Sequence, residues 1–290
     1  MLMTGVIRMT TAYTSIEHRP LFTSTNLPGD GQRPEAMQGH WVLARVGKRV
    51  LRPGGLELTR KMLDALAITP EDRVIEFAPG LGVTARMVLQ KQFRSYQAVE
   101  REPRAVENLR EQLKGTCAEI VQGRAQTTGL PSGSASVVYG EAMLSMQCTE
   151  DKSRIIAEAR RLLQVGGRYG IHELCFRSDQ VSDHLRREIQ AAMAKEIHVG
   201  VQPLLRREWA SLFENHDIKV IWSAEAPMHL LEPRRLLSDE GISGALRVGF
   251  NIFRDSMLRQ RVFAMRRVFQ KYQQHIGAIA IVGVTISNAQ

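Results

Sequence analysis

The sequence predicts an α/β protein with a doubly wound, mostly parallel sheet of seven strands. Short apolar runs alternate with helical segments along most of the chain. Each parallel strand needs a crossover connection, and helices of this length supply one. One apolar run, Val74 to Phe77, breaks at Pro79-Gly80 and Gly82 before a helix begins. A strand, a glycine turn and a helix in that order let the backbone approach a ligand closely, because glycine has no Cβ.

Each element is predicted from its hydrophobic period and from the residues that end it. The expected strands cover residues 74–77, 95–99, 119–122, 135–139, 168–174, 218–222 and 278–284. The expected helices cover residues 57–67, 83–91, a stretch from 103, then 150–164, 181–198 and 205–216. Pro103 is well placed in the first turn of its helix. The pair Gly166-Gly167 predicts the end of the helix before it.

Composition predicts a soluble globular protein, and cysteine usage predicts a reducing cytoplasm. Of its 290 residues, 43% are apolar and 24% are charged, which is ordinary for a globular protein. No apolar run approaches the roughly 18 residues of a membrane span. The N-terminus lacks the basic and apolar regions of a signal peptide. The three cysteines are widely spaced, which argues against a disulfide framework or a metal site.

Four regions are expected along the chain. They are an N-terminal arm, partly flexible, at residues 1–38, a core at 39–226, a basic helical insertion at 227–276, and the last strand of the core at 277–290. Tyr13, His18 and Phe22 in the arm are candidates for a lid over a substrate. The alternative is an unstructured tail, which is the usual behaviour of chain ends.

The insertion between the sixth and seventh strands is basic and amphipathic. Residues 232–275 hold eight Arg and one Lys against four acids, in a chain whose net charge is +9. Phenylalanines stand among these arginines, as in amphipathic helices. We expect a helical cap over the carboxyl ends of the sheet. The net charge of the whole chain permits an anionic small molecule, a nucleic acid or an anionic membrane surface as partner. The arginines of the cap favour a negatively charged small molecule or an amphiphile, with a solvated surface as the alternative.

A second basic stretch precedes the first core helix. Arg49 and Arg52 are candidate contacts for an anionic ligand, with a solvated surface as the alternative. The pair Gly54-Gly55 stands directly before that helix. Its free amides suit a carboxylate at the helix start, and a plain turn between helices is the competing interpretation.

The glycine turn fits two kinds of ligand. The spacing Gly80-x-Gly82-x-x-Ala85 matches the fingerprint of a dinucleotide pyrophosphate. Glu76, at the end of the preceding strand, suits a ligand with an ammonium group and is awkward beside a pyrophosphate. Glu100, at the end of the second strand, can accept both hydroxyls of a ribose, which either ligand has.

The pattern Glu76-x-x-x-Gly80-x-Gly82 resembles the first motif of the class I S-adenosylmethionine-dependent methyltransferases. Leu130-Pro131 before the fourth strand and a Gly-Gly turn before the fifth resemble small-molecule methyltransferases of the ubiquinone-biosynthesis type. The resemblance covers about residues 56–174. It implies S-adenosylmethionine as cofactor, S-adenosylhomocysteine as product, and a seventh strand inserted antiparallel beside the sixth.

The resemblance also implies a set of cofactor-binding residues at the carboxyl ends of the strands. Glu76 and the glycine turn would hold the methionine portion, Glu100 the ribose, and Arg101 would lie near the adenine. Arg124 stands where the family usually has an aspartate that bonds the adenine, so that contact is expected from backbone or from Gln126. The full set is Glu76, Ala78, Pro79, Gly80, Gly82, Glu100, Arg101, Arg124, Ala125, Gly140 and Glu141.

Methyl transfer from a sulfonium is an in-line displacement that mainly requires a well-held acceptor. If the acceptor must lose a proton, His172, Glu173 or Glu141 is the candidate base. A structural role is the alternative for each of them.

The sequence therefore predicts a methyltransferase acting on an anionic acceptor that is small or lipid-like, with the oligomeric state open. One rival is an RNA methyltransferase that uses the basic cap, and nucleic acid is the less favoured partner. Another is a protein that binds S-adenosylmethionine without turnover. A dehydrogenase is the weakest rival, because Glu76 and the terminal strand pair count against it.

Overall fold

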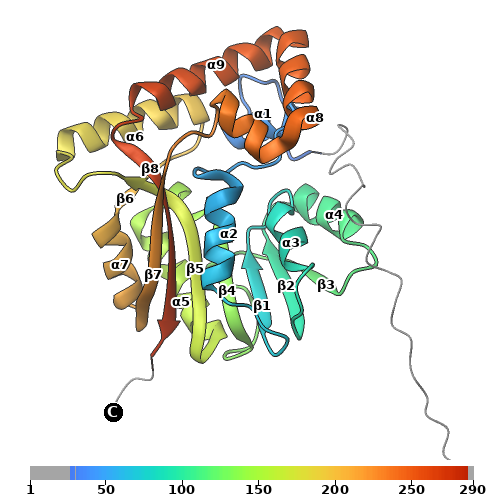
Figure 1. The fold of residues 1–290 in the computed structure, drawn as a ribbon, viewed down its shortest axis with the longest axis vertical. Coiled ribbons are helices and arrows are strands. Elements are labelled where there is room, and N and C mark those ends of the chain that lie inside the picture. Colours follow the sequence, from blue (N-terminus) through green and yellow to red (C-terminus); the bar gives the residue numbers. More distant parts are fainter. Residues whose placement is uncertain (1–26, 30, 287–290) are drawn as a thin grey trace, which may run out of the picture.

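The computed structural model describes residues 27–29 and 31–286 and contains one continuous mixed sheet (Figure 1). The strand order is β3-β2-β1-β4-β5-β8-β7, with a short β6 paired to β5. The strands are β1 Arg73–Phe77, β2 Ser95–Glu100, β3 Ala118–Gln122, β4 Ala135–Glu141, β5 Leu163–Phe176, β6 Leu204–Leu205, β7 Ile218–Pro227 and β8 Ile276–Thr285. The predicted lid residues Tyr13, His18 and Phe22 lie outside the described residues.

The sheet is parallel except for its last strand. β1 pairs in parallel with β2 and β4, and β4 pairs in parallel with β5. β8 runs antiparallel between β5 and β7. The predicted sheet, with an antiparallel seventh strand beside the sixth, is confirmed. The two-residue β6 was not expected, because so short a strand leaves no periodic signal.

Helices cover both faces of the sheet. On one face lie α2 Gly55–Ala65, α3 Val83–Val88 and α4 Pro103–Gln112, and on the other lie α5 Thr149–Leu162 and α7 Arg206–Glu214. β8 shows how one strand serves both faces, since its side chains alternate. Ala278 and Ala280 pack toward α2, whereas Ile279 and Ile281 pack toward α5 and α7.

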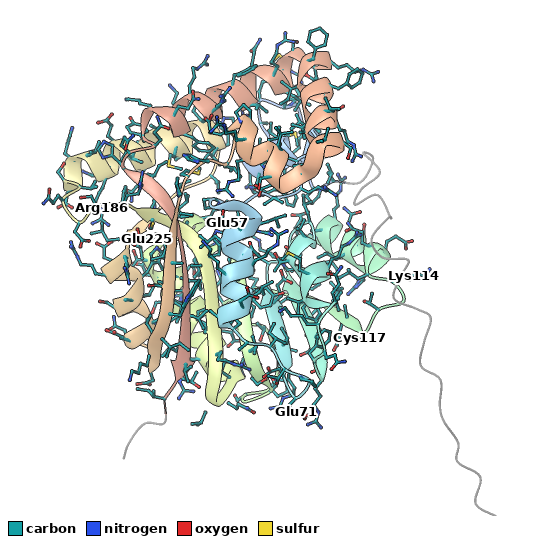
Figure 2. All side chains as sticks on the ribbon, viewed as in Figure 1. Glu57, Glu71, Lys114, Cys117, Arg186 and Glu225 are labelled. Atoms are coloured by element: carbon teal, nitrogen blue, oxygen red, sulfur yellow. The ribbon has the colours of Figure 1, made fainter. Side chains whose placement is uncertain are left out.

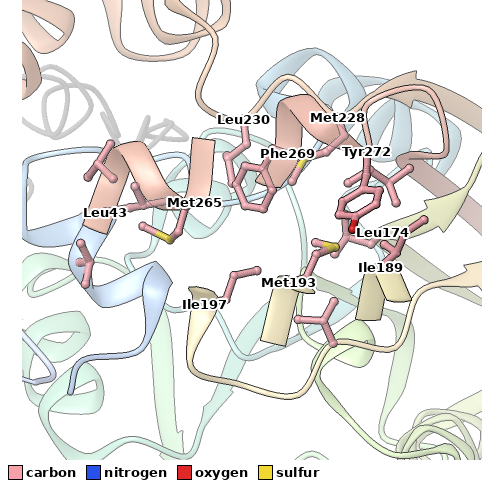
Figure 3. Close-up of a cluster of buried hydrophobic side chains, with 14 of the residues drawn as sticks. Leu43, Leu174, Ile189, Met193, Ile197, Met228, Leu230, Met265, Phe269 and Tyr272 are labelled. Carbon is pink, nitrogen blue, oxygen red and sulfur yellow. The ribbon is translucent and has the colours of Figure 1, made fainter. Parts of the chain in front are cut away.

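A third apolar core lies above the carboxyl ends of the strands (Figures 1 and 3). Its helices are α1 Gly39–Arg45, α6 Asp183–Ile197, α8 Pro233–Arg254 and α9 Ser256–Lys271. Met193, Met265 and Phe269 fill it, and Leu174 joins it from the end of β5. The prediction drew the cap from the insertion alone, but α1 and α6 also contribute. Their apolar faces do not reveal where they pack.

The predicted glycine stop after α5 is wrong, because the chain enters β5 before it reaches the Gly166-Gly167 pair. α5 ends at Leu162, and β5 begins at the next residue, so Gly166 (φ +75°) lies in the first part of that strand. α8 is interrupted at Gly241, where φ is +70°. Across residues 27–29 and 31–286, no helix combines the length and the apolar composition that crossing a bilayer requires.

The three cysteines are free thiols. Cys117 and Cys148 are exposed and Cys175 is buried. Cys117 lies at the edge of the sheet between α4 and β3, far from the cap (Figure 2).

Candidate functional site

A cavity of about 480 Å³ opens where the strands end beneath the cap. The chain leaves β1 for β2 on one side, whereas β4 lies on its other side. This is the switch in strand order at which open α/β sheets bind ligands. We call this space the main cavity.

Most of the predicted cofactor residues line the main cavity. Its wall includes Glu76, Ala78, Pro79, Gly80, Glu100, Arg101, Arg124, Ala125 and Glu141, together with Gln126. Gly82, Gly140 and His172 do not reach it, and Glu173 lines a second cavity instead. Of the two glycines of the turn, Gly80 therefore lines the main cavity and Gly82 does not.

The two glycines of the turn do different work. Both have positive φ, +55° at Gly80 and +69° at Gly82. A Cβ at Gly80 would have only the Ala78 carbonyl oxygen nearby, at 3.9 Å, so this backbone faces open space. A Cβ at Gly82 would lie 2.8 Å from Leu109 Cδ2. Gly80 thus permits close approach by a ligand, and Gly82 permits α4 to pack against the turn.

Glu76 is a buried carboxyl on the floor of the main cavity. The hydroxyls of Tyr96 and Tyr139, on the strands at either side, both donate to its Oε2, Tyr139 at 2.7 Å. Burial raises the pKa of Glu76 to about 7, although these hydrogen bonds lower it. A ligand cation beside it would favour the charged form.

Glu100 is held by backbone amides at the end of β2. Its Oε1 accepts from the amides of Arg101 at 2.7 Å and Glu102 at 2.9 Å, and its Oε2 accepts from the Gly80 amide at 3.2 Å. Burial raises the pKa of Glu100, and the amides oppose that rise. The Gly80 bond ties the glycine turn to the predicted ribose carboxylate.

Glu141 is the centre of a buried polar network under the main cavity. Its Oε1 accepts from Thr59 at 2.6 Å and lies 3.3 Å from Arg52 Nε, and its Oε2 accepts from Thr84. His172 Nδ1 lies 2.8 Å from the same Oε1. Burial alone would raise the pKa of Glu141, but the charge of Arg52 and the His172 bond outweigh it and lower the pKa to about 2. Glu141 is therefore an anionic anchor and a weak base.

The other two candidate bases are enclosed. His172 is fully buried, with Nδ1 against Glu141 and Nε2 against the Pro53 carbonyl oxygen. Glu173 accepts from three successive backbone amides, those of Met143, Leu144 and Ser145, at 2.7 to 2.9 Å. These contacts suit a structural role for His172 and Glu173, in which they hold the surrounding backbone and side chains in place.

Arg52 has a guanidinium nitrogen left over. Its Nε donates to Thr59 at 2.7 Å. Its Nη2 is buried and has no hydrogen-bond partner among the described residues, and the side chain lines the main cavity. A buried donor without a partner is costly, so this position suits an anionic ligand group.

The carboxylate expected at the Gly54-Gly55 turn comes from the chain itself. Asp239 Oδ1 accepts from the Leu56 amide at 3.0 Å, in the first turn of α2. Arg49 is also engaged, since its Nε lies 2.9 Å from Glu240. The neighbouring Glu57 faces the cap, 3.9 Å from Arg235 (Figure 2).

A second cavity, of about 50 Å³, adjoins the first beneath the cap. On the scale at which one water occupies about 10–15 Å³, it has room for a group of a few heavy atoms. Apolar side chains line most of it, among them those of Met193, Met228, Met265 and Phe269 (Figure 3). The residues that line both cavities are His40, Leu51, Ala142 and Met146.

His40 stands at the junction of the two cavities. Its Nδ1 is buried and makes no hydrogen bond within residues 27–29 and 31–286. Burial, assisted by the charge of Arg101, lowers the pKa of His40 to about 4. The junction therefore presents a neutral imidazole to whatever occupies it.

The arginines of the insertion do not line the main cavity, contrary to the inference that linked them to an anionic ligand. Arg261, for example, donates to the carbonyl oxygens of Pro34, Glu35, Met37 and Glu196, which fixes α9 to the segment before α1. The arginines that do line the cavity are Arg49, Arg52, Arg101 and Arg124.

Several residues of the site were missed from the sequence. Thr59, Thr84 and His40 have no local signal, because their partners are far away in the chain. The tyrosines that donate to Glu76 did have a signal in the sequence. A carboxyl on a buried strand needs hydrogen-bond donors, and Tyr96 and Tyr139 lie on the neighbouring strands.

The sequence of the chain matches one protein family and one relative of known sequence. The family described as "Methyltransferase domain" matches residues 75–171. An uncharacterised protein of Haemophilus influenzae is 31% identical over 239 residues, which span 81% of this chain and 91% of that protein.

Solved structures share the fold at low identity. A Haemonchus contortus phosphoethanolamine N-methyltransferase, solved with phosphomonomethylethanolamine and S-adenosylhomocysteine, has a TM-score of 0.65 at 13% identity, over 93% of this chain and 62% of that chain. A geranyl diphosphate methyltransferase in complex with S-adenosylmethionine has a TM-score of 0.54 at 17% identity, over 78% of this chain and 84% of that chain. These likenesses confirm the predicted fold class.

Proposed function

Because this chain belongs to the class I S-adenosylmethionine-dependent methyltransferases, we propose that it methylates a small, lipid-like acceptor that carries an anionic group. The observation that carries the proposal is the main cavity, whose buried charged groups complement the polar parts of the cofactor. The second cavity is apolar and shares wall residues with the main cavity, which supports an acceptor with a lipid-like part.

The residues of the main cavity fit S-adenosylmethionine by their chemistry. Glu76 would pair with the ammonium group and the free Nη2 of Arg52 with the carboxylate of the methionine portion. Glu100 would accept the ribose hydroxyls beside Gly80. The adenine would lie against the segment 123–126, with Arg101 nearby.

When bound, the cofactor supplies a sulfonium methyl group that an acceptor atom can attack. The chain's task is to hold the acceptor in line with that methyl and to exclude water. We assign Glu141, His172 and Glu173 to positioning, because Glu141 is a weak base and the other two do not line the main cavity. In this assignment none of them takes a proton from the acceptor.

The acceptor is argued from the second cavity and from the arginines. An apolar group of a few atoms fits beside Met193 and Met265, and methionine side chains adapt readily to such a group. Arg101 and Arg124 line the main cavity and form no ion pair within the described residues, so they can face an anionic group. One fold neighbour is named for geranyl diphosphate, and another was solved with phosphomonomethylethanolamine, both of which carry phosphate.

Calorimetric titration with S-adenosylhomocysteine and with NADH tests the cofactor assignment. We expect micromolar binding of S-adenosylhomocysteine, its loss in Glu100→Ala, and no binding of NADH. Glu107→Ala, an exposed acid on α4, is the matched control and should bind like the wild type. Binding of NADH, or of neither ligand, would refute the proposal.

Turnover is tested separately with S-adenosylmethionine labelled in its methyl group. Label should pass to an organic-soluble small-molecule fraction of a cell extract and not to RNA. Label in RNA would favour the nucleic-acid rival. Tight cofactor binding with no transfer to any fraction would favour a protein that binds without turnover.

A further inference from the structure

The outer side of α8 exposes an apolar stripe. Ile242 is 74% exposed, Leu246 69%, Phe250 61% and Phe253 78%. Spacings of four, four and three residues place these four side chains along one side of a helix. We call them the α8 apolar face.

This exposure is not the far side of an ordinary amphipathic helix. The opposite side of α8 is already buried in the protein through Gly244 and Val248. An exposed apolar patch on a helix whose other side is packed marks a surface that another body covers.

The charges around the α8 apolar face select the kind of partner. Arg247 and Arg254 are exposed on the same helix, next to the stripe in the helical projection. Apolar side chains flanked by arginines suit the boundary between lipid headgroups and acyl chains, where anionic lipids supply the countercharge.

We propose that the α8 apolar face binds the surface of a bilayer that contains anionic lipids. A second copy of the chain fits less well. In a symmetric contact each patch meets itself, so Arg247 and Arg254 would be brought toward the same arginines of the partner. A lipid surface buries the four apolar side chains and also pairs with the arginines.

This docking brings the wall of the main cavity close to the lipid. α8 is fixed to the end of α1, where Asn251 Nδ2 donates to the Val46 carbonyl oxygen at 3.1 Å. α1 in turn carries His40 and Trp41, which line the main cavity. A lipid-like acceptor would then have a short path from the bilayer to the site, although membrane docking does not depend on that acceptor.

Vesicle flotation of the full chain tests the proposal. The vesicles contain phosphatidylcholine alone, or equal parts of phosphatidylcholine and phosphatidylglycerol. We expect wild type to float only with the anionic vesicles. The double variant Leu246→Ser and Phe250→Ser replaces two exposed side chains of this face. It should lower the partition coefficient of the protein between vesicles and buffer by roughly tenfold or more. The matched pair Val165→Ser and Ile221→Ser, both more than half exposed on the sheet, should leave it unchanged.

Amide hydrogen exchange of the wild-type protein tests the proposal without any substitution. Anionic vesicles should slow amide hydrogen exchange in residues 242–254 and leave α7 unaffected. Equal flotation with both kinds of vesicle, no difference between the two substituted pairs, or no exchange protection in α8 would overturn the proposal. So would a wild-type dimer in sedimentation that the α8 pair converts to a monomer. Binding of S-adenosylhomocysteine to the wild type tests the proposed function independently of flotation. Thermal unfolding of each variant shows whether that variant is folded.

Discussion

Glu76 is a carboxyl whose burial keeps it poised between its two protonation states. Both tyrosine donors reach the same oxygen, Oε2, and the strand positions of Tyr96 and Tyr139 fix them there. The pKa of about 7 belongs to the protein without ligand. A cation in the main cavity would lower that pKa, because it favours the carboxylate.

The first prediction follows from that pKa. Below about pH 7 Glu76 must lose a proton before it can pair with an ammonium group, so the affinity for S-adenosylhomocysteine should fall as the pH falls through 7. Calorimetry in two buffers of different ionisation enthalpy should detect proton release near pH 7. Glu76→Gln should bind more weakly and with a flat profile over this range. A sloped profile in that variant would assign the proton to another group.

Arg52 supplies the second prediction at this scale. Arg52→Met should weaken S-adenosylhomocysteine binding by about 1.5–3 kcal/mol, the usual contribution of a hydrogen bond to a charged group. 5′-Methylthioadenosine lacks the methionine carboxylate, so its affinity should change much less. An equal loss for both ligands would mean that the substitution disturbs the Glu141 network instead.

The junction between cap and core depends on a short acidic pair at the Gly241 kink of α8. Glu240 accepts from the backbone amides of Arg49 and Val50, both at 2.8 Å. Lys48 is buried, 3.7 Å from Glu240 and 3.9 Å from Asp239. Burial lowers the pKa of Lys48, and these two acids oppose that shift. The cap is thus attached through charges that are costly to leave unpaired.

Glu240→Gln should therefore destabilise the protein by about 3 kcal/mol, because it leaves a buried cation with less compensation. Urea unfolding measures the loss. Glu57→Gln removes an exposed carboxylate that faces Lys61 and Arg235, and it should cost less than about 1 kcal/mol. Similar losses in the two variants would show that the buried pair has no special role.

The glycine turn gives a matched pair of variants. Gly82→Ala meets Leu109 and a positive φ, so it should lower the free energy of unfolding by about 1–3 kcal/mol. Gly80→Ala has a positive φ but no clash, and its methyl would occupy ligand space. We expect it to be the more stable variant and the one that loses more affinity for S-adenosylhomocysteine. The reverse order would contradict the division of roles within the turn.

At the scale of the whole molecule, the sequence predicted what is encoded locally. The seven longer strands, the glycine turn and the acids near the ends of β1 and β2 all have short-range signals, and they lie as expected. The composition of the cap and the partners of Arg52 and Glu141 were not predictable. They depend on contacts such as that between Thr59 and Glu141, which join distant segments.

The main cavity has walls from both the sheet and the cap, so a ligand there should stabilise the whole protein. S-adenosylhomocysteine at a hundredfold excess over its dissociation constant should raise the free energy of unfolding by about 2.7 kcal/mol. Thermal unfolding at increasing ligand concentration measures this. NADH is the control and should leave the midpoint unchanged.

The cap also constrains how the site can open. The chain passes between core and cap before α2, on both sides of α6, before α8 and after α9. A lid on a single hinge can rotate away as one body, but a cap that is connected to the core by so many segments resists rotation. Passage of molecules must then rely on local movements of side chains and short segments at the rim. Release of product should accordingly depend more on residues at the cavity mouth than on any large closure of the cap.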